Sequence, residues 1–266
     1  MSIDPQKQDL KIGIVGAGAM GRGIAQVSAT GGMPVYIFDA ADGAAAAAKD
    51  FIVSMINRSM EKGRMEKEEG EAAIARLHVA ENLDGLGDCD LVVEAIVENI
   101  DIKQKVFQQL EEIVRPETII ASNTSSIRIS SIASACNHRE RIAGLHFFNP
   151  VPLMKLVEVI NGTDTSAEVT EALEVIGKRM GRVPVVVKDA PGFLVNLGGR
   201  AYSTESLRIV SEGVATPFQV DAVMREACGF RMGPFELLDL TGIDVNFPVS
   251  QIIYNGYFQD KRLSTY

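Results

Sequence analysis

The hexapeptide Gly16-Ala17-Gly18-Ala19-Met20-Gly21 constrains the fold of this chain more than any other feature. It follows a short apolar run, Lys11 to Val15, and opens a small-residue helical pattern that extends to Ala29. Lacking Cβ atoms, the first two glycines permit a tight turn and the close approach of a pyrophosphate, and the third permits close packing of helix on strand. The N–H groups and the dipole of the helix N-terminus favour the charge of the pyrophosphate. The expected cofactor contacts in this loop are Gly16, Gly18, Ala19, Met20 and Gly21.

An acidic residue follows the second expected strand, Val35 to Phe38, at the position where dinucleotide-binding folds hold a ribose. This residue is Asp39, 18 residues after Gly21. Its carboxylate would repel a 2′-phosphate, and no Arg or Lys occurs between Asp39 and Lys49. The sequence therefore predicts NAD as the cofactor and disfavours NADP. The alternative, a chance glycine hexapeptide, explains neither the flanking strand and helix nor the placement of Asp39.

Alternating strand and helix patterns continue through the next 130 residues or so, which predicts an α/β fold with a Rossmann-type doubly wound sheet. Further strands are expected at Leu91 to Val97, Thr118 to Ser122, Ile142 to His146, Met154 to Ile160 and Val183 to Lys188. The first of these is apolar almost throughout, as in a parallel sheet covered by helices on both faces. Helices are expected from Asp42 toward Gly63, from Asn99 to Val114 and from Thr165 to Gly181.

Beyond Lys188 the chain shows only helical patterns. Thr216-Pro217-Phe218-Gln219 combines an N-capping Thr, a Pro at the first helical position and a Gln that closes a capping box. Gly233-Pro234 is typical of another helix start. We therefore expect two domains, a Rossmann domain at residues 1–190 and a small all-helical domain at residues 191–266.

The charge balance and the cysteines exclude several function classes. The 266 residues include 26 Lys and Arg against 35 Asp and Glu, a net charge of −9, which disfavours a nucleic-acid partner. No apolar run approaches the roughly 18 to 20 residues that span a bilayer, and the polar segment Met1 to Leu10 does not resemble a signal peptide, so we expect a cytoplasmic protein without a membrane partner. Cys89, Cys136 and Cys228 match no metal-binding spacing, so we expect reduced, structural cysteines and no metal site.

A histidine and a glutamate occur in apolar strand patterns where such side chains are costly to bury. Strand alternation places Glu158 on the same face as Leu156 and Ile160, where a carboxylate is desolvated and needs a partner. His146 would be a suitable partner, because a carboxylate that holds a histidine favours the imidazolium formed in general-base catalysis. The alternative is a satisfied core histidine and an unrelated Glu at the sheet edge, and the spacing alone leaves both interpretations open.

Two further polar groups are candidates for binding a substrate oxygen. Ser122-Asn123-Thr124-Ser125-Ser126 follows a buried strand at the edge where this class of sheet binds ligands. The alternative is a cap for a helix from Ile127 onward, and this alternative is favoured for Ser126. Asn196 lies in an apolar run, Phe193 to Leu197, so its amide is expected to be buried and to pair with backbone or with a ligand.

Together these segments resemble the L-3-hydroxyacyl-CoA dehydrogenase family, in the same order over nearly the whole chain. The matching motifs are the glycine loop, Val92–Asn99, Ser122–Ser126, His146–Pro150, Lys188–Phe193 and Gly233–Leu237. The resemblance implies that a nicotinamide cofactor takes a hydride from C3 of a 3-hydroxyacyl-CoA between the two domains, and that the second domain forms a homodimer.

The resemblance also implies residue roles. His146 would be the general base toward the 3-hydroxyl and Glu158 would orient and polarise it, while Ser125 and Asn196 would hydrogen-bond the hydroxyl as it becomes a carbonyl. The residues that match cofactor-binding positions are Ala95, Glu98, Lys103, Ser125 and Asn149.

Within the family, Asp244–Phe247 and Tyr254–Phe258 are similar to members that act on 3-hydroxyadipyl-CoA in phenylacetate breakdown, with members that act on 3-hydroxybutyryl-CoA as the near alternative. The family continues beyond the position of Tyr266 to a basic, aromatic-ended segment, so we expect a truncated C-terminal domain and a lost basic contact to substrate. In the basic segment Arg58 to Lys67, four basic residues face two acidic ones, a local charge of +2. By resemblance Lys62 is the expected contact to CoA, and the other three basic side chains are expected to be solvated.

Two other functions were compared with this hypothesis. A catalytically idle NAD-binding relative would need the glycine loop and Asp39 but not the set Ser125, His146, Glu158 and Asn196. A β-hydroxyacid dehydrogenase would use a lysine in the cleft, and no lysine replaces His146 or Asn196. The presence of the complete set favours the 3-hydroxyacyl-CoA dehydrogenase.

Overall fold

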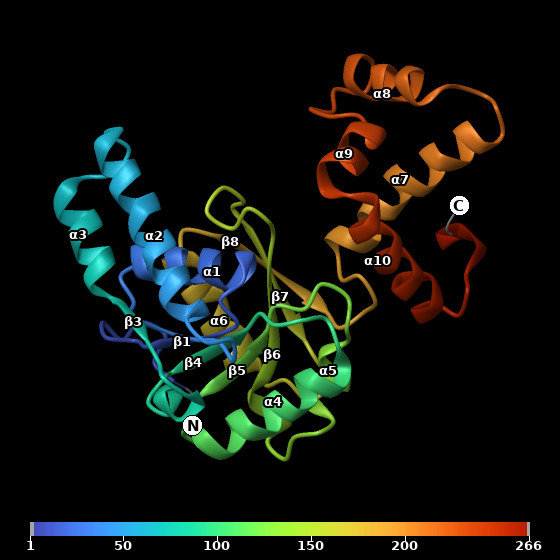
Figure 1. Cartoon of the computed structure of the whole chain (residues 1–266). Coiled ribbons are helices and arrows are strands. Elements are labelled where there is room, and N and C mark those ends of the chain that lie inside the picture. Colours follow the sequence, from blue (N-terminus) through green and yellow to red (C-terminus); the bar gives the residue numbers. More distant parts are fainter. Residues whose placement is uncertain (1–2, 265–266) are drawn as a thin grey trace. The chain divides into compact units, whose positions relative to one another are not determined.

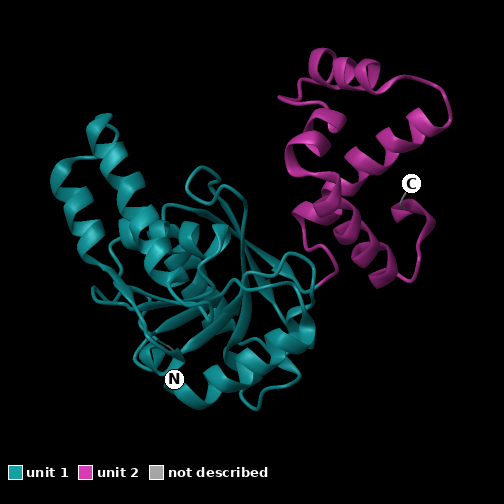
Figure 2. Ribbon diagram, in the orientation of Figure 1, with its two compact units in different colours: residues 1–189 teal, residues 190–266 magenta. Residues whose placement is uncertain are grey.

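The structure, a computed structural model that describes residues 3–264, divides into two units (Figure 2). The first unit ends at Asp189 and the second begins at Ala190.

The framework of the first unit is an eight-stranded sheet with the order β3-β2-β1-β4-β5-β6-β7-β8. The strands are β1 (Ile12–Val15), β2 (Val35–Phe38), β3 (Leu77–Val79), β4 (Leu91–Glu94), β5 (Ile119–Ser122), β6 (Ile142–Phe147), β7 (Leu156–Asn161) and β8 (Val183–Lys188). Strands β1 to β6 are parallel, β7 is antiparallel to β6, and β8 is parallel to β7. The connection at residues 148–155 is too short for the crossover that a parallel neighbour requires, so β7 runs back along β6.

Helices cover the sheet in the pattern of a doubly wound fold (Figure 1). They are α1 (Ala19–Thr30), α2 (Ala44–Glu61), α3 (Lys67–Ala75), α4 (Ile100–Ile113), α5 (Ile129–Ala133) and α6 (Ala167–Arg179), with short 3₁₀ helices η1 (Leu83–Leu86) and η2 (Arg139–Arg141). Side chains of α1, α2 and α6 share one buried cluster with the strands, including Ile24, Ile52 and Leu173. Helices α4 and α5 lie on the other face of the sheet (Figure 1). The predicted Rossmann-type fold is confirmed.

Two local expectations differ from the structure. The strand expected from Leu91 to Val97 ends at Glu94, because the Glu94 carboxylate accepts the backbone N–H of Ile96 at 2.7 Å and turns the chain. Helix α3 and strand β3 were not expected. Helix α3 is polar and buries only Gly70 and Ala73, so it carries no apolar stripe that a periodicity search would detect.

The second unit is helical throughout its described residues. Its elements are α7 (Val195–Ser211), α8 (Pro217–Glu226), α9 (Pro234–Thr241), α10 (Ile243–Gly256) and the 3₁₀ helix η3 (Lys261–Leu263). The predicted capping box at Thr216 is present, since the Thr216 hydroxyl accepts the N–H of Gln219 and the Gln219 side chain accepts the N–H of Thr216. The Asp221 carboxylate accepts the N–H groups of Phe235 and Glu236 at the start of α9, a tertiary cap that the sequence did not indicate.

Cys89 and Cys136 are buried and Cys228 is exposed, each as a free thiol. Within residues 3–264, no helix has both the length and the apolar character needed to cross a bilayer.

Candidate active site

The carboxyl ends of the parallel strands bring most of the predicted site residues to one edge of the sheet. The glycine loop follows β1, Asp39 follows β2, and the segment from Ala95 to Glu98 follows β4. Ser125 follows β5, and Asn149 follows β6. In doubly wound sheets this is the edge at which ligands bind.

Each of the three glycines in the loop after β1 is explained by a different feature of the structure. Gly16 has φ +102°, and a Cβ there would lie 2.6 Å from the carbonyl oxygen of Ala95. A Cβ at Gly21 would collide with the carbonyl oxygen of Gly16, so this glycine permits the close approach of α1 to the loop. At Gly18 a Cβ would meet no atom within 4 Å, which leaves open the space that a pyrophosphate needs. The first turn of α1 contains no acidic side chain. The loop therefore fits a dinucleotide.

Asp39 is fixed in place by the backbone around it. One carboxylate oxygen accepts the N–H of Ala17 in the glycine loop at 2.7 Å, and the other accepts the N–H of Ala41 at 2.9 Å. The carboxylate thus joins the loops after β1 and β2 at the predicted ribose position. Its contact with a ribose stays a prediction.

A buried charged cluster, which the sequence analysis missed, supports the loop after β4. Lys103 on α4 is 1% exposed, and its ammonium lies 2.7 Å from Glu94 Oε1 and 3.3 Å from Glu98 Oε2. Glu94 is fully buried and also accepts the Ser122 hydroxyl at 2.7 Å. The pattern of Glu94, Glu98 and Lys103 on either side of a strand end could have suggested this cluster. Lys103 and Glu98 were predicted to contact the cofactor, and of these two Glu98 is the more exposed.

Glu98 joins the loop after β4 to the turn after β5. Its Oε1 accepts the hydroxyls of Thr124 and Ser126 and the N–H of Ser125. Burial opposes ionisation of Glu98, but the Lys103 ammonium and the two hydroxyl donors together lower its pKa below the ordinary glutamate value. Glu98 is therefore ionised at neutral pH.

The expectation that Ser126 caps a helix is wrong. The Ser126 hydroxyl donates to Glu98 at 2.7 Å, and the N–H of Ile127 is accepted by the Thr124 hydroxyl at 3.0 Å. Helix α5 begins only at Ile129, where the Asp189 carboxylate accepts the N–H groups of Ile129 and Ser130, both at 2.8 Å. The Asp189 carboxylate, about 60 residues away in sequence, thus supplies the helix cap that the local pattern had predicted for Ser126.

His146 and Glu158 lie directly opposite each other on the antiparallel strands β6 and β7. His146 Nδ1 is 2.7 Å from Glu158 Oε2, and the two residues are 5% and 0% exposed. An unrelated Glu at the sheet edge, the alternative that the sequence left open, is therefore excluded. Because Nδ1 is engaged by the carboxylate, Nε2 is the ring nitrogen suited to exchange a proton with a substrate. The ring of Phe148 packs on the imidazole, with centroids 4.5 Å apart.

The turn after β5 is tied to the strand that carries His146. Asn123 Oδ1 accepts the backbone N–H of Phe147 at 2.8 Å. Ser125 is half-buried on the same turn, and Asn149 is exposed just after β6. Asn123, which the sequence analysis did not single out, therefore fixes the Ser125 turn to the end of β6.

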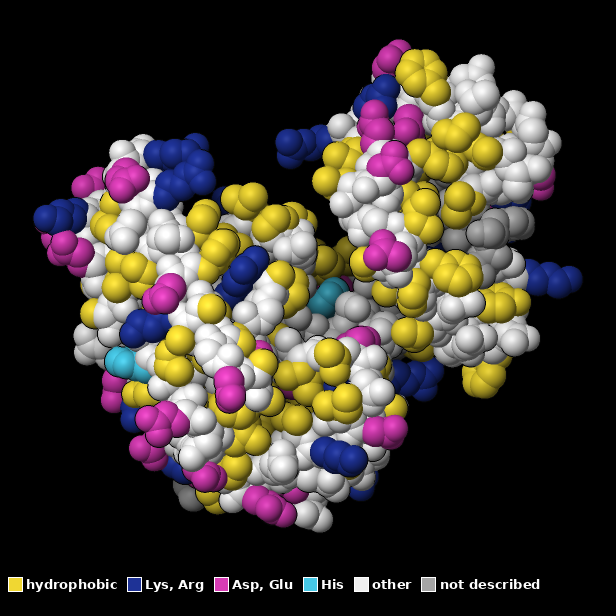
Figure 3. Space-filling view, viewed as in Figure 1, with side chains coloured by type: hydrophobic (Ala, Val, Ile, Leu, Met, Phe, Trp, Pro, Cys, Tyr) yellow, Lys and Arg dark blue, Asp and Glu magenta, His cyan; other side chains and the backbone are white. Residues whose placement is uncertain are grey.

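The remaining predicted residues lie outside this sheet edge. Asn196 is the second residue of α7 in the helical unit, and it is half-buried rather than buried as expected. Lys62 is exposed at the C-terminal end of α2, and Arg58, Arg64 and Lys67 are exposed as well. Figure 3 shows Lys and Arg side chains gathered at the ends of α2 and α3.

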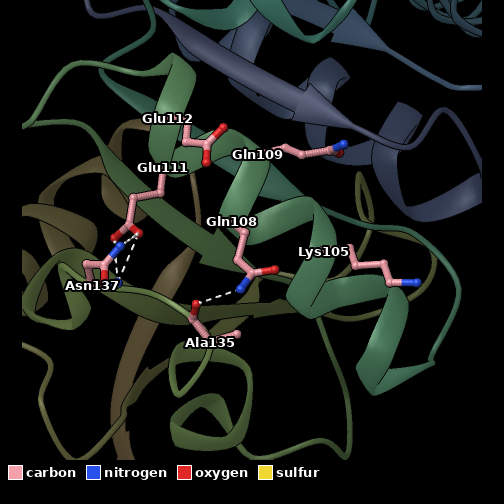
Figure 4. A pocket seen from close by; sticks show the side chains of 7 residues that line it. All are labelled: Lys105, Gln108, Gln109, Glu111, Glu112, Ala135 and Asn137. Carbon is pink, nitrogen blue, oxygen red and sulfur yellow. Dashed lines mark hydrogen bonds between the residues drawn. The ribbon is translucent and has the colours of Figure 1, made fainter.

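A separate hollow of about 430 Å³ lies along α4 (Figure 4) and contains no predicted site residue. Its polar side chains bind neighbouring backbone: Gln108 donates to the carbonyl of Ala135, and Glu111 accepts the N–H groups of Asn137 and His138. These bonds attach α4 to the loop after α5, which is a structural role.

Comparisons with known proteins identify relatives over nearly the whole chain. Residues 11–190 match the family description "3-hydroxyacyl-CoA dehydrogenase, NAD binding domain", and residues 192–265 match "3-hydroxyacyl-CoA dehydrogenase, C-terminal domain". A 3-hydroxyadipyl-CoA dehydrogenase of Escherichia coli is 42% identical over 94% of this chain, which spans only 53% of that protein.

Two further relatives carry a different substrate in their names. A probable 3-hydroxybutyryl-CoA dehydrogenase of Deinococcus radiodurans is 40% identical over 95% of this chain and 90% of its own length. The crystal structure of a 3-hydroxybutyryl-CoA dehydrogenase from Escherichia coli K12 has a TM-score of 0.94 and 41% identity, covering 97% of this chain and 55% of that one.

Proposed function

The chain belongs to the 3-hydroxyacyl-CoA dehydrogenase family of NAD-dependent oxidoreductases, and on this premise we propose that it oxidises an L-3-hydroxyacyl-CoA to the 3-oxoacyl-CoA. The observation that carries the proposal is the buried pair of His146 and Glu158, 2.7 Å apart. A histidine held in this way accepts a proton at its other ring nitrogen while the carboxylate stabilises the resulting imidazolium.

In the proposed reaction, His146 Nε2 takes the proton of the 3-hydroxyl group, and C3 becomes a carbonyl carbon. Ser125 and Asn196 donate hydrogen bonds to the oxygen as its charge develops. When bound, NAD⁺ supplies the acceptor for the hydride that leaves C3. Glu158 acts through His146, because its carboxylate holds Nδ1 and hence the orientation of the ring.

The residues around the glycine loop fit the NAD that the matched domain binds. Gly18 offers open space for the pyrophosphate, and the carboxylate of Asp39 lies at the end of β2 for the adenosine ribose. Glu98 and Asn149 would contact the nicotinamide half, with Ala95 beside Gly16. Lys103 would act chiefly through Glu98, since it is buried between two carboxylates.

The proposed substrate is 3-hydroxyadipyl-CoA, as in phenylacetate breakdown, and 3-hydroxybutyryl-CoA is the second candidate. The Escherichia coli relative is named for the first substrate and the Deinococcus radiodurans relative for the second. Lys62, exposed in the basic segment at the end of α2, would meet the anionic part of CoA.

The helical unit would form a homodimer. Large apolar side chains are exposed on its helices, among them Phe218 at 76%, Leu240 at 70% and Ile243 at 66%. Figure 3 shows apolar side chains gathered over this unit. Apolar groups exposed in such number are typical of a surface that another chain covers.

An assay of NADH formation tests the proposed reaction. The protein, NAD⁺ and either 3-hydroxyacyl-CoA are mixed, and absorbance of NADH is followed. We expect turnover that falls by about 10³-fold or more in His146→Gln, while NAD binding measured by calorimetry stays unchanged. Tight NAD binding without NADH formation from either substrate would instead identify a catalytically idle relative.

A further inference from the structure

Helix α7 of the helical unit carries a buried arginine whose charge is not neutralised. Arg200 is 7% exposed, and its guanidinium donates from Nε to the carbonyl oxygen of Asn196 at 3.1 Å and from Nη1 to the hydroxyl of Ser250. Both acceptors are neutral. Burial lowers the pKa of this guanidinium, as expected when a cation leaves water without a counter-ion.

No ion pair in the described part of the helical unit includes Arg200. The ion pairs within the described part of the unit join Arg208 to Glu205, Arg225 to Glu236 and Arg262 to Asp260. The buried carboxylate of Asp221 accepts two backbone N–H groups at the start of α9. Arg200 therefore lacks a carboxylate partner among residues 3–264, whereas buried arginines in proteins are normally paired.

One nitrogen of the guanidinium is still available for a ligand. Within residues 3–264, Arg200 Nη2 makes no hydrogen bond. The fully buried side-chain nitrogens without a partner in this range are Arg115 Nε and Arg141 Nε. Since Nη2 has no partner and is not one of these two, it is not fully buried. An arginine with two nitrogens fixed by neutral acceptors and a third accessible is prepared to receive an anion.

Arg200 lies one helical turn from Asn196, a residue that is proposed to bind the substrate. It lies four residues after Asn196 and is bonded to the Asn196 carbonyl, so the two residues share one face of α7 with a rise of about 6 Å between them. Asn196 is the proposed donor to the oxygen on C3. In a six-carbon acyl chain that ends in a carboxyl group, C3 and the terminal carbon are separated by three C–C bonds of about 1.5 Å each. This separation suits groups one helical turn apart.

We propose that Arg200 binds a carboxylate at the far end of the acyl group, so that the preferred substrate is a 3-hydroxyacyl-CoA derived from a dicarboxylic acid. The inference rests on the proposed function and specifies the substrate class of the same site. Arg200 is then a specificity-determining residue, because an acyl chain that ends in a methyl group leaves its charge unpaired.

The alternative occupant is a carboxylate from a second copy of the chain. Arg200 is 93% covered by its own chain, which leaves room for a small anion but little surface for another protein. The substrate is therefore the favoured partner, and the oligomeric state enters the test as an outcome.

The test compares 3-hydroxyadipyl-CoA with 3-hydroxybutyryl-CoA in the wild-type protein, in Arg200→Gln and in Arg200→Lys. Glutamine can still bond Asn196 but carries no charge, and lysine keeps the charge. We expect kcat/KM for the dicarboxylic substrate to fall by about 100-fold in Arg200→Gln and less in Arg200→Lys, with little change for 3-hydroxybutyryl-CoA. Arg208→Gln, which removes a cation already paired on the same helix, is the matched control and should not change the preference.

The proposal would be overturned if Arg200→Gln lowered kcat/KM equally for both substrates, or if it changed only the molecular mass of the protein in solution. A second measurement needs no variant: adipyl-CoA should inhibit wild-type oxidation of 3-hydroxybutyryl-CoA at least tenfold more strongly than hexanoyl-CoA, which has the same chain length without the carboxylate. Equal inhibition would exclude the carboxylate site even if Arg200→Gln does not fold. If neither substrate is oxidised, the proposed function fails, and calorimetric binding of the same two CoA esters still decides the role of Arg200.

Discussion

At the scale of single residues, the pairing of two strands determines how His146 can act. Antiparallel β6 and β7 place His146 and Glu158 opposite each other, which brings Nδ1 to 2.7 Å from the carboxylate. A parallel neighbour would have required a long crossover and a different register. The short connection between β6 and β7 thus fixes the orientation of the ring and assigns Nε2, the nitrogen opposite the carboxylate, to the proposed proton transfer.

Replacement of Glu158 by glutamine tests this arrangement. Glu158→Gln keeps the shape of the side chain but removes the charge that stabilises the imidazolium, so we expect kcat to fall by about 10²- to 10³-fold with an unchanged Kd for NAD. Steady-state kinetics and calorimetry give the two values. Glu168→Gln on the exposed surface of α6 is the control and should keep wild-type kcat. Wild-type turnover in Glu158→Gln would show that the carboxylate has only a structural role.

The cysteines differ in their environment, and so we expect them to differ in reactivity. Burial raises the pKa of Cys89 to about 12 and that of Cys136 to about 11, so neither thiol forms appreciable thiolate at neutral pH. Cys228 is exposed. A thiol reagent at pH 7 should therefore modify one cysteine quickly in the native protein and all three after unfolding in urea, as counted by mass spectrometry. Rapid modification of Cys89 in the native protein would contradict its burial.

At the scale of secondary-structure elements, features that depend on neighbouring residues were predicted from the sequence, whereas contacts between distant segments were not. The strand Val183–Lys188 and the capping box at Thr216 were found because each depends on neighbouring residues. The capping of α5 by Asp189 could not be found, because its partners lie about 60 residues apart. In the cluster around Lys103, the charged residues Glu94, Glu98 and Lys103 are close in sequence, but the hydroxyls of Ser122 and Ser126 that bind the two carboxylates come from β5 and the turn after it, nearly 30 residues away.

Alanine substitutions should separate the two functions of the glycine loop. A Cβ at Gly18 meets no atom, so Gly18→Ala should fold with a wild-type melting temperature but bind NAD at least tenfold more weakly, because the methyl group occupies the space for the pyrophosphate. A Cβ at Gly21 collides with backbone, so Gly21→Ala should lower the melting temperature itself. Thermal unfolding and NAD calorimetry give the two values. Unchanged NAD affinity in Gly18→Ala would show that the cofactor lies elsewhere.

The bonds of Glu98 should make part of the stability depend on pH. Its pKa is lowered in the folded state, so its stabilising contribution is complete above the unfolded value near 4.3 and is lost as the pH falls through the lower folded pKa. Ser126→Ala removes one donor to this carboxylate and should cost about 1 to 2 kcal/mol at pH 7. We expect the difference from wild type, measured by urea unfolding, to shrink below about pH 4. Ser131→Ala on α5 is a control away from Glu98, and an equal difference at pH 7 and pH 3 would contradict the assignment.

At the scale of the whole molecule, the proposed function requires an acidic protein to bind two anionic ligands. The net charge of −9 gives no general attraction for NAD or CoA, so local groups must supply it. In the proposed function, backbone N–H groups at the start of α1 would bind the pyrophosphate of NAD, and the basic segment from Arg58 to Lys67, with a local charge of +2, would attract CoA. Because such local attraction is screened by salt, KM for the acyl-CoA should depend on ionic strength more than KM for NAD.

The exposed apolar side chains of the helical unit bear on the assembly of the molecule into the proposed homodimer. Among residues 190–264, the large apolar side chains that are buried are Phe193, Val220 and Ile253, while Leu240 and Ile243 are 70% and 66% exposed. If these exposed groups form the proposed homodimer interface, Leu240→Asp places a charge in it and should give a monomer by light scattering, because an unpaired charge is costly to bury. Val79→Asp, at an apolar position on β3 in the first unit that is 42% exposed, is the control and should leave the mass unchanged. A dimer that survives Leu240→Asp would place the contact on another face of the molecule.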